Sequence, residues 1–361
     1  MSDLKDMVAD YILNLPPYPK GREWRAGEHL IRLSANENPL GPSPKALAAI
    51  TKALKTIHRY PDGAGGVLKE KLARRLEFPP DHIILGNGSN EIFELAARTF
   101  LQREEEVLLP DPTFAYYRIA AQAQGGRCVS VPLRDFKIDL SEIAKKVNSK
   151  TKLIFLSNPN NPTGTIFTRS EFDDFLTHLP SHVVVLVDEA YGEYVTALDY
   201  PLSQEYWQRE RWIITTKTFS KFYGLAGLRI GYGVARKELI EHLEKVRQPF
   251  SVNLLAQMAA EAALEDEEHR EKTARINEVG KRYLYEELTS LGLSFVPSEA
   301  NFILVHFGPH VSQVMEGLMR KGIVVRGMAG YGLKEYIRVT IGLPEDNTSF
   351  IEALKRWKKG S

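Results

Sequence analysis

Residues 183–187 form the run Val183-Val184-Val185-Leu186-Val187, five apolar residues with no polar position among them. A strand with one face in water alternates apolar and polar residues, so a strand that is apolar throughout must be covered on both faces. Shorter runs of the same kind occur at 107–109, 153–156 and 212–215, and stretches with helical apolar spacing separate them. This alternation predicts an α/β fold with a mostly parallel sheet between layers of helices.

The pattern changes in the C-terminal part of the chain. After a long helical region at 252–291, short strands are expected at 301–305 and 337–341, with a helix at 311–321 between them. This order favours a smaller α+β domain. We expect residues 1–40 to form an N-terminal arm and part of the small domain, residues 41–275 the large domain, and residues 276–361 the small C-terminal domain.

The composition argues against several classes of function. Lys and Arg number 47 against 46 Asp and Glu, so no global field would draw the protein to nucleic acid or an anionic membrane. No stretch approaches about 20 uninterrupted apolar residues, and the N-terminus lacks the basic start and apolar block of a signal peptide. We therefore expect a soluble, cytoplasmic protein. The single cysteine, Cys128, and the unpatterned histidines predict neither a disulfide nor a metal site.

Four polar motifs each follow a predicted strand directly. They are Gly86-Asn87-Gly88-Ser89-Asn90-Glu91, Ser157-Asn158-Pro159-Asn160-Asn161-Pro162-Thr163-Gly164, Asp188-Glu189-Ala190-Tyr191 and Thr218-Phe219-Ser220-Lys221. In open α/β sheets, ligands bind beyond the carboxyl ends of the strands, so these motifs are expected to converge on one site. Each alone has a simpler explanation: Asn-Pro-Thr-Gly suits a turn, Asp188 could cap a helix, and most lysines are solvated.

Together, these motifs resemble the fold-type I aminotransferases, which depend on pyridoxal 5′-phosphate (PLP). The resemblance rests on Asn161-Pro162-Thr163-Gly164, Asp188-Glu189-Ala190-Tyr191, Ser220-Lys221 and the segment 224–232, and it covers nearly the whole chain. It implies a large PLP-binding domain built on a seven-stranded sheet, with a smaller domain from the C-terminus and the N-terminal arm.

The resemblance also implies which residues hold and activate the cofactor. Lys221 would bind PLP as a Schiff base, and its free amine would then shuttle a proton. Asp188 would pair with the pyridine nitrogen and keep it protonated, which makes the ring an electron sink. Tyr191 and Asn161 would hydrogen-bond the ring oxygen O3′.

The resemblance assigns further contacts to the cofactor ring and phosphate. Phe114 would stack on the ring, with Tyr117 as the weaker candidate for that role. The phosphate would lie at a helix N-terminus and be held by Gly88, Ser89, Asn90, Thr218, Ser220 and Arg229. Tyr60 matches a family tyrosine that reaches the phosphate from the other subunit. A homodimer with shared active sites is therefore expected.

Within this superfamily, the chain resembles the histidinol-phosphate aminotransferases most. The similar segments are 17–21, 33–42, 298–302 and 322–326. The implied reaction transfers an amino group between L-histidinol phosphate and 2-oxoglutarate in histidine biosynthesis, and it converts 2-oxoglutarate to glutamate. Arg338 matches the arginine that grips the substrate carboxylate, and a guanidinium suits that bidentate contact. Arg326 would help to bind the phosphate alongside Arg338, which must also accept the carboxylate of glutamate in the other half-reaction. The residues expected to bind substrate are Tyr18, Asn36, Arg326 and Arg338.

Other functions are compatible with the same cofactor residues. A threonine-phosphate decarboxylase would also bind a phosphorylated amino compound, but the His-Gly-Gly stretch with which that family usually opens is absent here. An aromatic or broad-range amino acid aminotransferase is a second alternative. A non-enzymatic PLP-fold regulator would need an attached DNA-binding domain, for which this chain has neither room nor a basic cluster.

Overall fold

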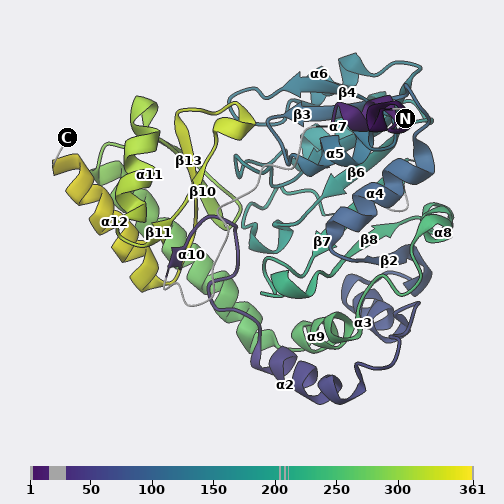
Figure 1. Cartoon of the computed structure of the whole chain (residues 1–361), viewed down its shortest axis with the longest axis horizontal. Coiled ribbons are helices and arrows are strands. Elements are labelled where there is room, and N and C mark those ends of the chain that lie inside the picture. The colour runs from purple at the N-terminus through teal and green to yellow at the C-terminus, as the bar shows by residue number, and fades with distance from the viewer. Residues whose placement is uncertain (1–2, 16–29, 203–204, 207–208, 210, 360–361) are drawn as a thin grey trace.

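The computed structural model describes residues 3–15, 30–202, 205–206, 209 and 211–359. Within these residues the strands form one seven-stranded sheet, one four-stranded sheet and one two-stranded pair. Figure 1 shows two bodies side by side, with the seven-stranded sheet in the larger one and the C-terminal helices in the smaller one.

The seven-stranded sheet confirms the predicted α/β fold. Its order is β2-β8-β7-β6-β5-β3-β4, and all neighbouring strands are parallel except β8, which runs antiparallel to both β7 and β2. The strands are β2 (Ile83–Gly86), β3 (Glu106–Asp111), β4 (Arg127–Pro132), β5 (Thr151–Ser157), β6 (Val184–Asp188), β7 (Trp212–Thr218) and β8 (Gly231–Ala235).

Helices cover this sheet on both faces, as its apolar strands require. In β5, Leu153 and Phe155 pack into a core with α4, α5 and α8, whereas Ile154 and Leu156 pack on the other face with α6 and α7. A third core joins α2, α3 and α9 to β2 and β8. The helices are α2 (Pro44–Ala53), α3 (Gly66–Leu76), α4 (Ser89–Phe100), α5 (Tyr116–Gln122), α6 (Leu140–Lys146), α7 (Arg169–His178), α8 (Lys237–Val246) and α9 (Leu254–Leu264).

The smaller body is built on a four-stranded antiparallel sheet of order β12-β13-β10-β9. Its apolar side chains form a core of their own with α10, α11 and α12. The elements are β9 (Phe295–Val296), β10 (Phe302–His306), β12 (Arg326–Gly327), β13 (Tyr336–Thr340), α10 (Glu267–Ser290), α11 (Val311–Met319) and α12 (Pro344–Lys359).

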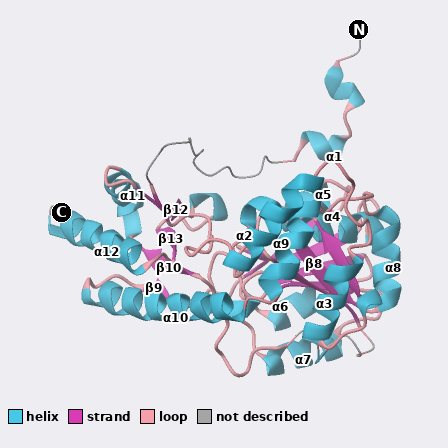
Figure 2. Ribbon diagram, turned by 90° about the horizontal axis from the view of Figure 1, so that it is seen from below, coloured by secondary structure: helices cyan, strands magenta, loops and turns pink. Residues whose placement is uncertain are grey.

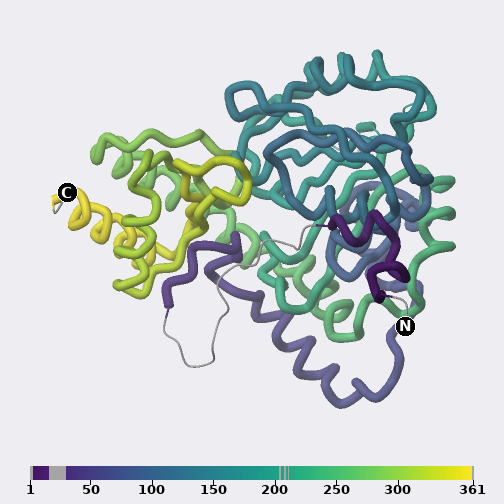
Figure 3. The backbone as a smooth tube through the Cα atoms, turned by 45° about the horizontal axis from the view of Figure 1, so that its top comes forward, coloured from purple at the N-terminus to yellow at the C-terminus, as the bar shows by residue number. Residues whose placement is uncertain are grey.

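A segment from the start of the chain completes this smaller body. Strand β1 (Ile31–Arg32) pairs in parallel with β11 (Ile323–Val324), and Leu33 belongs to the same core. Figure 3 shows the purple tube of this segment beside the yellow-green C-terminal part of the chain. Before it, helix α1 (Asp10–Leu13) lies against the large body, where Asp10 forms an ion pair with Arg103 at 2.7 Å.

The helical region predicted at 252–291 is two helices. The chain breaks between α9 and α10, where the Asp266 side chain accepts a hydrogen bond from the Lys45 backbone N–H at 3.3 Å. Helix α10 then runs unbroken through the predicted domain boundary at residue 275, and Figure 2 shows it extending along the smaller body. The division at residues 40 and 275 stays a prediction. Within the described residues no helix is long and apolar enough to cross a membrane.

Candidate active site

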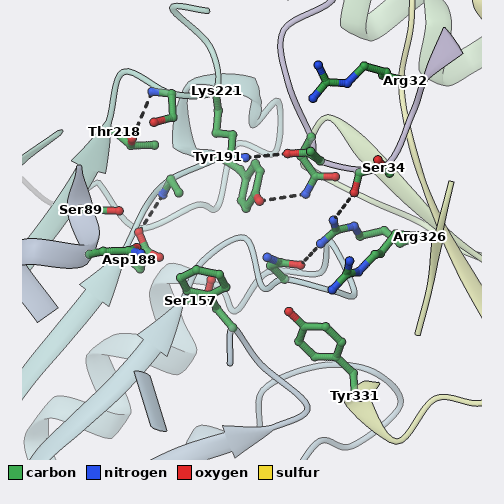
Figure 4. A pocket seen from close by; sticks show the side chains of 18 of the residues that line it. Arg32, Ser34, Ser89, Ser157, Asp188, Tyr191, Thr218, Lys221, Arg326 and Tyr331 are labelled. Carbon is green, nitrogen blue, oxygen red and sulfur yellow. Dashed lines mark hydrogen bonds between the residues drawn. The ribbon is translucent and has the colours of Figure 1, made fainter. Parts of the chain in front are cut away.

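A cavity of about 370 Å³ opens at the carboxyl ends of β5, β6 and β7, facing the smaller body (Figure 4). The four motifs singled out in the sequence meet there, because neighbouring parallel strands end at the same edge of the sheet. The predicted site residues that line it are Asn36, Ser89, Asn90, Phe114, Asn161, Asp188, Tyr191, Thr218, Ser220, Lys221, Arg229, Arg326 and Arg338.

Lys221 follows β7 and extends into this cavity, where its Nζ donates a hydrogen bond to the Ala35 carbonyl at 2.8 Å. Burial, together with the nearby Arg338 guanidinium, lowers the pKa of Lys221 to about 8. A lysine with a pKa near 8 has a much larger neutral fraction at pH 7 than an ordinary lysine. The neutral amine is the form that bonds to a carbonyl carbon.

Asp188 is the last residue of β6 and is buried. Its Oδ2 accepts a hydrogen bond from the Tyr117 hydroxyl at 2.6 Å, and its Oδ1 accepts from Thr216 Oγ1 and the Ala190 N–H, both at 3.2 Å. Burial raises the pKa of Asp188 to about 6, while the hydrogen bonds from Tyr117 and Thr216 oppose that rise. Above pH 6 the cavity therefore has a carboxylate in its wall that can pair with a cationic ring N–H.

The two bodies and the N-terminal segment meet at a set of polar contacts. Asn36 Nδ2 donates to the Tyr191 hydroxyl at 2.9 Å. Arg338, on β13, donates to Asn161 Oδ1 and, at 2.9 Å, to the Ser34 carbonyl. Burial raises the pKa of Tyr191 to about 12, so its hydroxyl stays protonated at neutral pH and can donate to an oxygen.

The predicted phosphate site is at the start of α4, where Ser89 and Asn90 line the cavity and the first backbone N–H groups of a helix lack intrahelical partners. Gly88 precedes this helix with a φ of +76°, and a Cβ there would lie 2.7 Å from Arg229 Nη2. A Cβ at Gly231 would lie 2.6 Å from the Ser89 nitrogen. Only glycine therefore lets the guanidinium and β8 approach the helix N-terminus this closely. Arg229 Nη1 also donates to the Ser220 hydroxyl at 3.3 Å.

These residues fit PLP. The helix N-terminus with Arg229 supplies the positive end that a phosphate needs, and Asp188 supplies a carboxylate for the pyridine N–H. Lys221 supplies the amine, and Phe114 supplies an aromatic wall. Within the described ranges, no group of three or more His, Cys, Asp or Glu side chains could hold a metal ion.

Two of the described residues that were predicted for the site, Gly88 and Tyr60, are not in the wall of this cavity. Gly88 lies just behind it, against Arg229. Tyr60 lies on the outside of the molecule, 82% exposed and stacked on Phe250 with ring centroids 4.7 Å apart. Tyr18 lies outside the described residues. Tyr117 is fully buried behind Asp188, so Phe114 is the aromatic residue that faces the cavity.

The sequence reasoning missed other residues of the cavity wall, including Arg32, Ser34 and Tyr331 (Figure 4). Arg32 forms an ion pair with Glu37 at 3.0 Å. Ser34 lies within the segment 33–42 and Arg32 adjoins it, so the similarity of this segment to known enzymes could have drawn attention to both. Tyr331 follows Gly330 in a short 3₁₀ helix, and no local pattern marks it as a site residue.

Comparisons with known proteins agree with this geometry. Residues 28–354 match the family model of class I and II aminotransferases. The chain is 46% identical over 351 residues to a histidinol-phosphate aminotransferase of Moorella thermoacetica, covering 95% of this chain and 91% of the relative. It is 43% identical over 355 residues to histidinol-phosphate aminotransferase 1 of Nitrosococcus oceani, covering 97% and 96%.

Solved structures share the fold. The histidinol-phosphate aminotransferase of Sinorhizobium meliloti, in complex with PLP, superposes with a TM-score of 0.87 at 27% identity, covering 96% of each chain. The L-threonine-O-3-phosphate decarboxylase of Porphyromonas gingivalis has a TM-score of 0.80 at 24% identity, covering 91% of this chain and 99% of that one. The second likeness shows a common fold alone.

Proposed function

We propose that this chain, which belongs to the class I and II aminotransferase family, transfers an amino group between L-histidinol phosphate and 2-oxoglutarate in histidine biosynthesis. It is a PLP-dependent aminotransferase, as the sequence predicted. The identity of 40–46% to histidinol-phosphate aminotransferases over nearly the whole chain supports the choice of substrate.

The observation that carries this proposal is the pairing of two arginines. Arg326 on β12 and Arg338 on β13 are direct partners in the antiparallel register, and both line the cavity. Like charges directly opposite each other on adjacent strands repel, so an anion bound between them would be favourable. A phosphate accepts several N–H bonds and carries up to two negative charges, which suits two guanidinium groups. Arg32 adds a third cation to the same wall.

The same arginines suit the second half of the reaction. 2-Oxoglutarate and glutamate carry two carboxylates, and each of these accepts paired N–H bonds from a guanidinium. One pocket can therefore bind both substrates, provided that the distal anion of each, phosphate or carboxylate, lies at the arginine pair. This would limit the enzyme to amino compounds with an anion at the far end.

Bound PLP supplies an electron sink for the carbanion that forms when the substrate Cα loses its proton. Lys221 would take the proton from the substrate Cα and deliver it to the cofactor carbon C4′. Its lowered pKa suits this transfer. Asp188 would hold the ring nitrogen protonated. Asn161 and Tyr191 would hold the ring oxygen, and Arg229 with the start of α4 would hold the phosphate.

We also propose a homodimer with shared active sites. Several apolar side chains are exposed on the N-terminal piece and in the segment from α2 to residue 57. They include Leu4, Met7, Leu47, Leu54 and Ile57, which are between 48% and 74% exposed. Burying such side chains in a subunit interface would be favourable. Tyr60 lies close to Leu54 and Ile57 in the sequence and is exposed outside its own cavity, as a residue that serves a partner subunit would be. We expect the enzyme to act in the cytoplasm.

The test is to offer purified enzyme L-histidinol phosphate, L-histidinol, L-phenylalanine and L-threonine phosphate in turn. Conversion of the bound cofactor to its amine form, followed by its ultraviolet–visible spectrum, should occur fastest with histidinol phosphate. Release of carbon dioxide from threonine phosphate would instead support the decarboxylase, and fastest reaction with phenylalanine would support the broad-range enzyme.

A variant separates the phosphate contact from general damage. Arg326→Gln should raise KM for histidinol phosphate about tenfold or more, because it removes a charge-assisted contact. The same change should have little effect on the slow reaction with unphosphorylated histidinol. Arg282→Gln is a matched control, because Arg282 is exposed on α10 and pairs with Glu278. Equal losses with both substrates would argue against the phosphate site.

A further inference from the structure

Tyr117 lies beneath the floor of the active site and takes no part in the cavity wall. Its side chain is fully buried, and its hydroxyl donates to Asp188 Oδ2 at 2.6 Å. The hydroxyl therefore reaches the carboxylate from the side away from the cavity. From the sequence, Tyr117 was a candidate only for stacking on the cofactor ring, but Phe114 is the one of the two that lines the cavity.

Three aromatic side chains hold the Tyr117 ring in place. It stacks on Phe155 with centroids 5.2 Å apart and planes within 7°. The rings of Phe93 and Phe114 meet it edge to face, at 5.0 and 5.5 Å. Because a fully buried ring with contacts on several sides has few alternative rotamers, the hydroxyl is fixed in direction. One residue thus touches both Phe114 and Asp188.

The donors around Asp188 are divided between its two oxygens. Oδ1 accepts from Thr216 and from the Ala190 backbone, both on longer bonds of 3.2 Å. Oδ2 accepts the shorter bond from Tyr117. A hydrogen bond donated to a carboxylate favours its charged form. Oxygen acceptors have two lone pairs each, so these three donors leave room for one more N–H from the cavity side.

We propose that Tyr117 is a positioning residue that keeps Asp188 ionised and oriented, so that the shared proton stays on the ring nitrogen of bound PLP. The proton between a carboxyl group and a pyridine has two places to reside. On the nitrogen it gives an ion pair, and on the oxygen it gives a neutral pair. A buried phenol that donates to the carboxylate stabilises the ion pair, in which the ring withdraws electrons best. This inference rests on the proposed pairing of Asp188 with the ring nitrogen and does not depend on the substrate.

The experiment uses Tyr117→Phe, which removes the hydroxyl and keeps the aromatic packing. Full-length apoenzyme is loaded with PLP labelled with ¹⁵N in the ring, and the nitrogen chemical shift is measured without substrate. In the variant the signal should move from the protonated value toward that of unprotonated pyridine. The dissociation constant of PLP should rise several-fold, because Asp188 without this donor takes up a proton more readily in the apoenzyme and must release it to pair with the ring N–H.

A neighbouring tyrosine provides the matched control. Tyr116 precedes Tyr117 on α5, and its hydroxyl bonds to another carboxylate, that of Glu94, away from Asp188. Tyr116→Phe should leave the nitrogen shift unchanged. If the two variants moved the shift equally, the effect would come from α5 in general and the proposal would be wrong.

A second background shows whether Tyr117 acts through Asp188. Asp188→Asn should itself move the nitrogen shift toward the unprotonated value, and adding Tyr117→Phe to it should change neither the shift nor the PLP affinity further. If the nitrogen shift were normal in Tyr117→Phe but moved in Asp188→Asn, the proposed role of Tyr117 would be wrong, and the pairing of Asp188 with the ring would stand. A normal shift in Asp188→Asn would refute the underlying pairing of Asp188 with the ring, and the proposal with it.

Discussion

Lys221→Met should make the cofactor-free protein more stable at pH 7, although it removes the residue that binds the cofactor. Lysine and methionine have unbranched side chains of similar length, so the substitution mainly removes the charge. In the folded protein the Lys221 amine lies beside Arg338, in a cavity wall that also includes Arg229 and Arg326. In the unfolded chain the same amine is fully hydrated and protonated at pH 7. On folding, the amine must therefore either lose its proton or be buried in its charged form. Both outcomes lower the free energy of unfolding.

The size of this cost follows from the pKa. Burial and Arg338 lower the pKa of Lys221 from 10.5 to about 8, a difference that corresponds to about 3.4 kcal/mol at pH 7. Lys221 is partly exposed to water in the cavity, which screens its charge, so we expect a gain in the free energy of unfolding of about 1–3 kcal/mol. Such a gain is typical of active-site residues that are placed for chemistry at the expense of stability.

The sign of the pH dependence gives a second check. Between pH 8 and 10.5 the unfolded chain binds more protons at this lysine than the folded protein does, so wild-type stability rises with pH in that window. The advantage of the methionine variant is thus fully present below pH 8 and should shrink to about 1 kcal/mol or less at pH 10.

Urea unfolding of both cofactor-free proteins, at equal protein concentration and at pH 7 and pH 10, measures this. Lys217→Met is the control, because Lys217 lies on the same strand-to-loop segment but forms an ion pair with Glu189 at 2.9 Å. Although burial opposes it, Glu189 and Glu193 raise the pKa of Lys217, and its loss should destabilise the fold by about 3 kcal/mol. If Lys221→Met brought no gain at pH 7, or the same gain at pH 10, the reasoning would be refuted.

Three further outcomes are expected. Gly224→Ala should lower the free energy of unfolding by about 2 kcal/mol or more, measured by urea unfolding, because its Cβ would lie 2.2 Å from the Gly41 carbonyl oxygen and its φ is +68°. PLP affinity, followed by fluorescence titration of the apoenzyme, should fall as pH drops through about 6, because Asp188 then takes up a proton; unchanged affinity at pH 5 would contradict this. Tyr60→Ala should weaken PLP binding about tenfold through loss of a phosphate contact from the partner subunit, whereas an unchanged PLP dissociation constant would argue against shared sites.

The sequence predicted correctly those features that depend on a few neighbouring residues. The apolar run at 183–187 requires cover on two faces, and β6 lies in the middle of the sheet with both faces buried. The polar motifs after the strands could be placed together because parallel strands end at one edge. Most of the predicted site residues consequently lie in one cavity.

What the sequence could not show depends on contacts between distant segments. Strand β8 reads Gly231-Tyr232-Gly233-Val234-Ala235, and its glycines are there because a Cβ at Gly231 or Gly233 would press on Ser89 or on Ile84 and Ile92. Glycine has low strand propensity, so no local pattern revealed the antiparallel strand between β2 and β7. Likewise, Arg326 and Arg338 could be proposed as substrate contacts, but their direct opposition follows from strand register alone.

The pairing of β1 with β11 bears on how the protein is made in the cell. Ile31 and its partner Ile323 are 292 positions apart, and the Leu33 carbonyl also receives the Thr340 N–H. At about 5–20 residues per second, a ribosome needs roughly 15–60 s between adding these two partners. Asn36 and Arg338, which both line the active-site cavity, are separated by a similar interval. The large body can therefore fold early, while the catalytic cavity can close only near the end of translation.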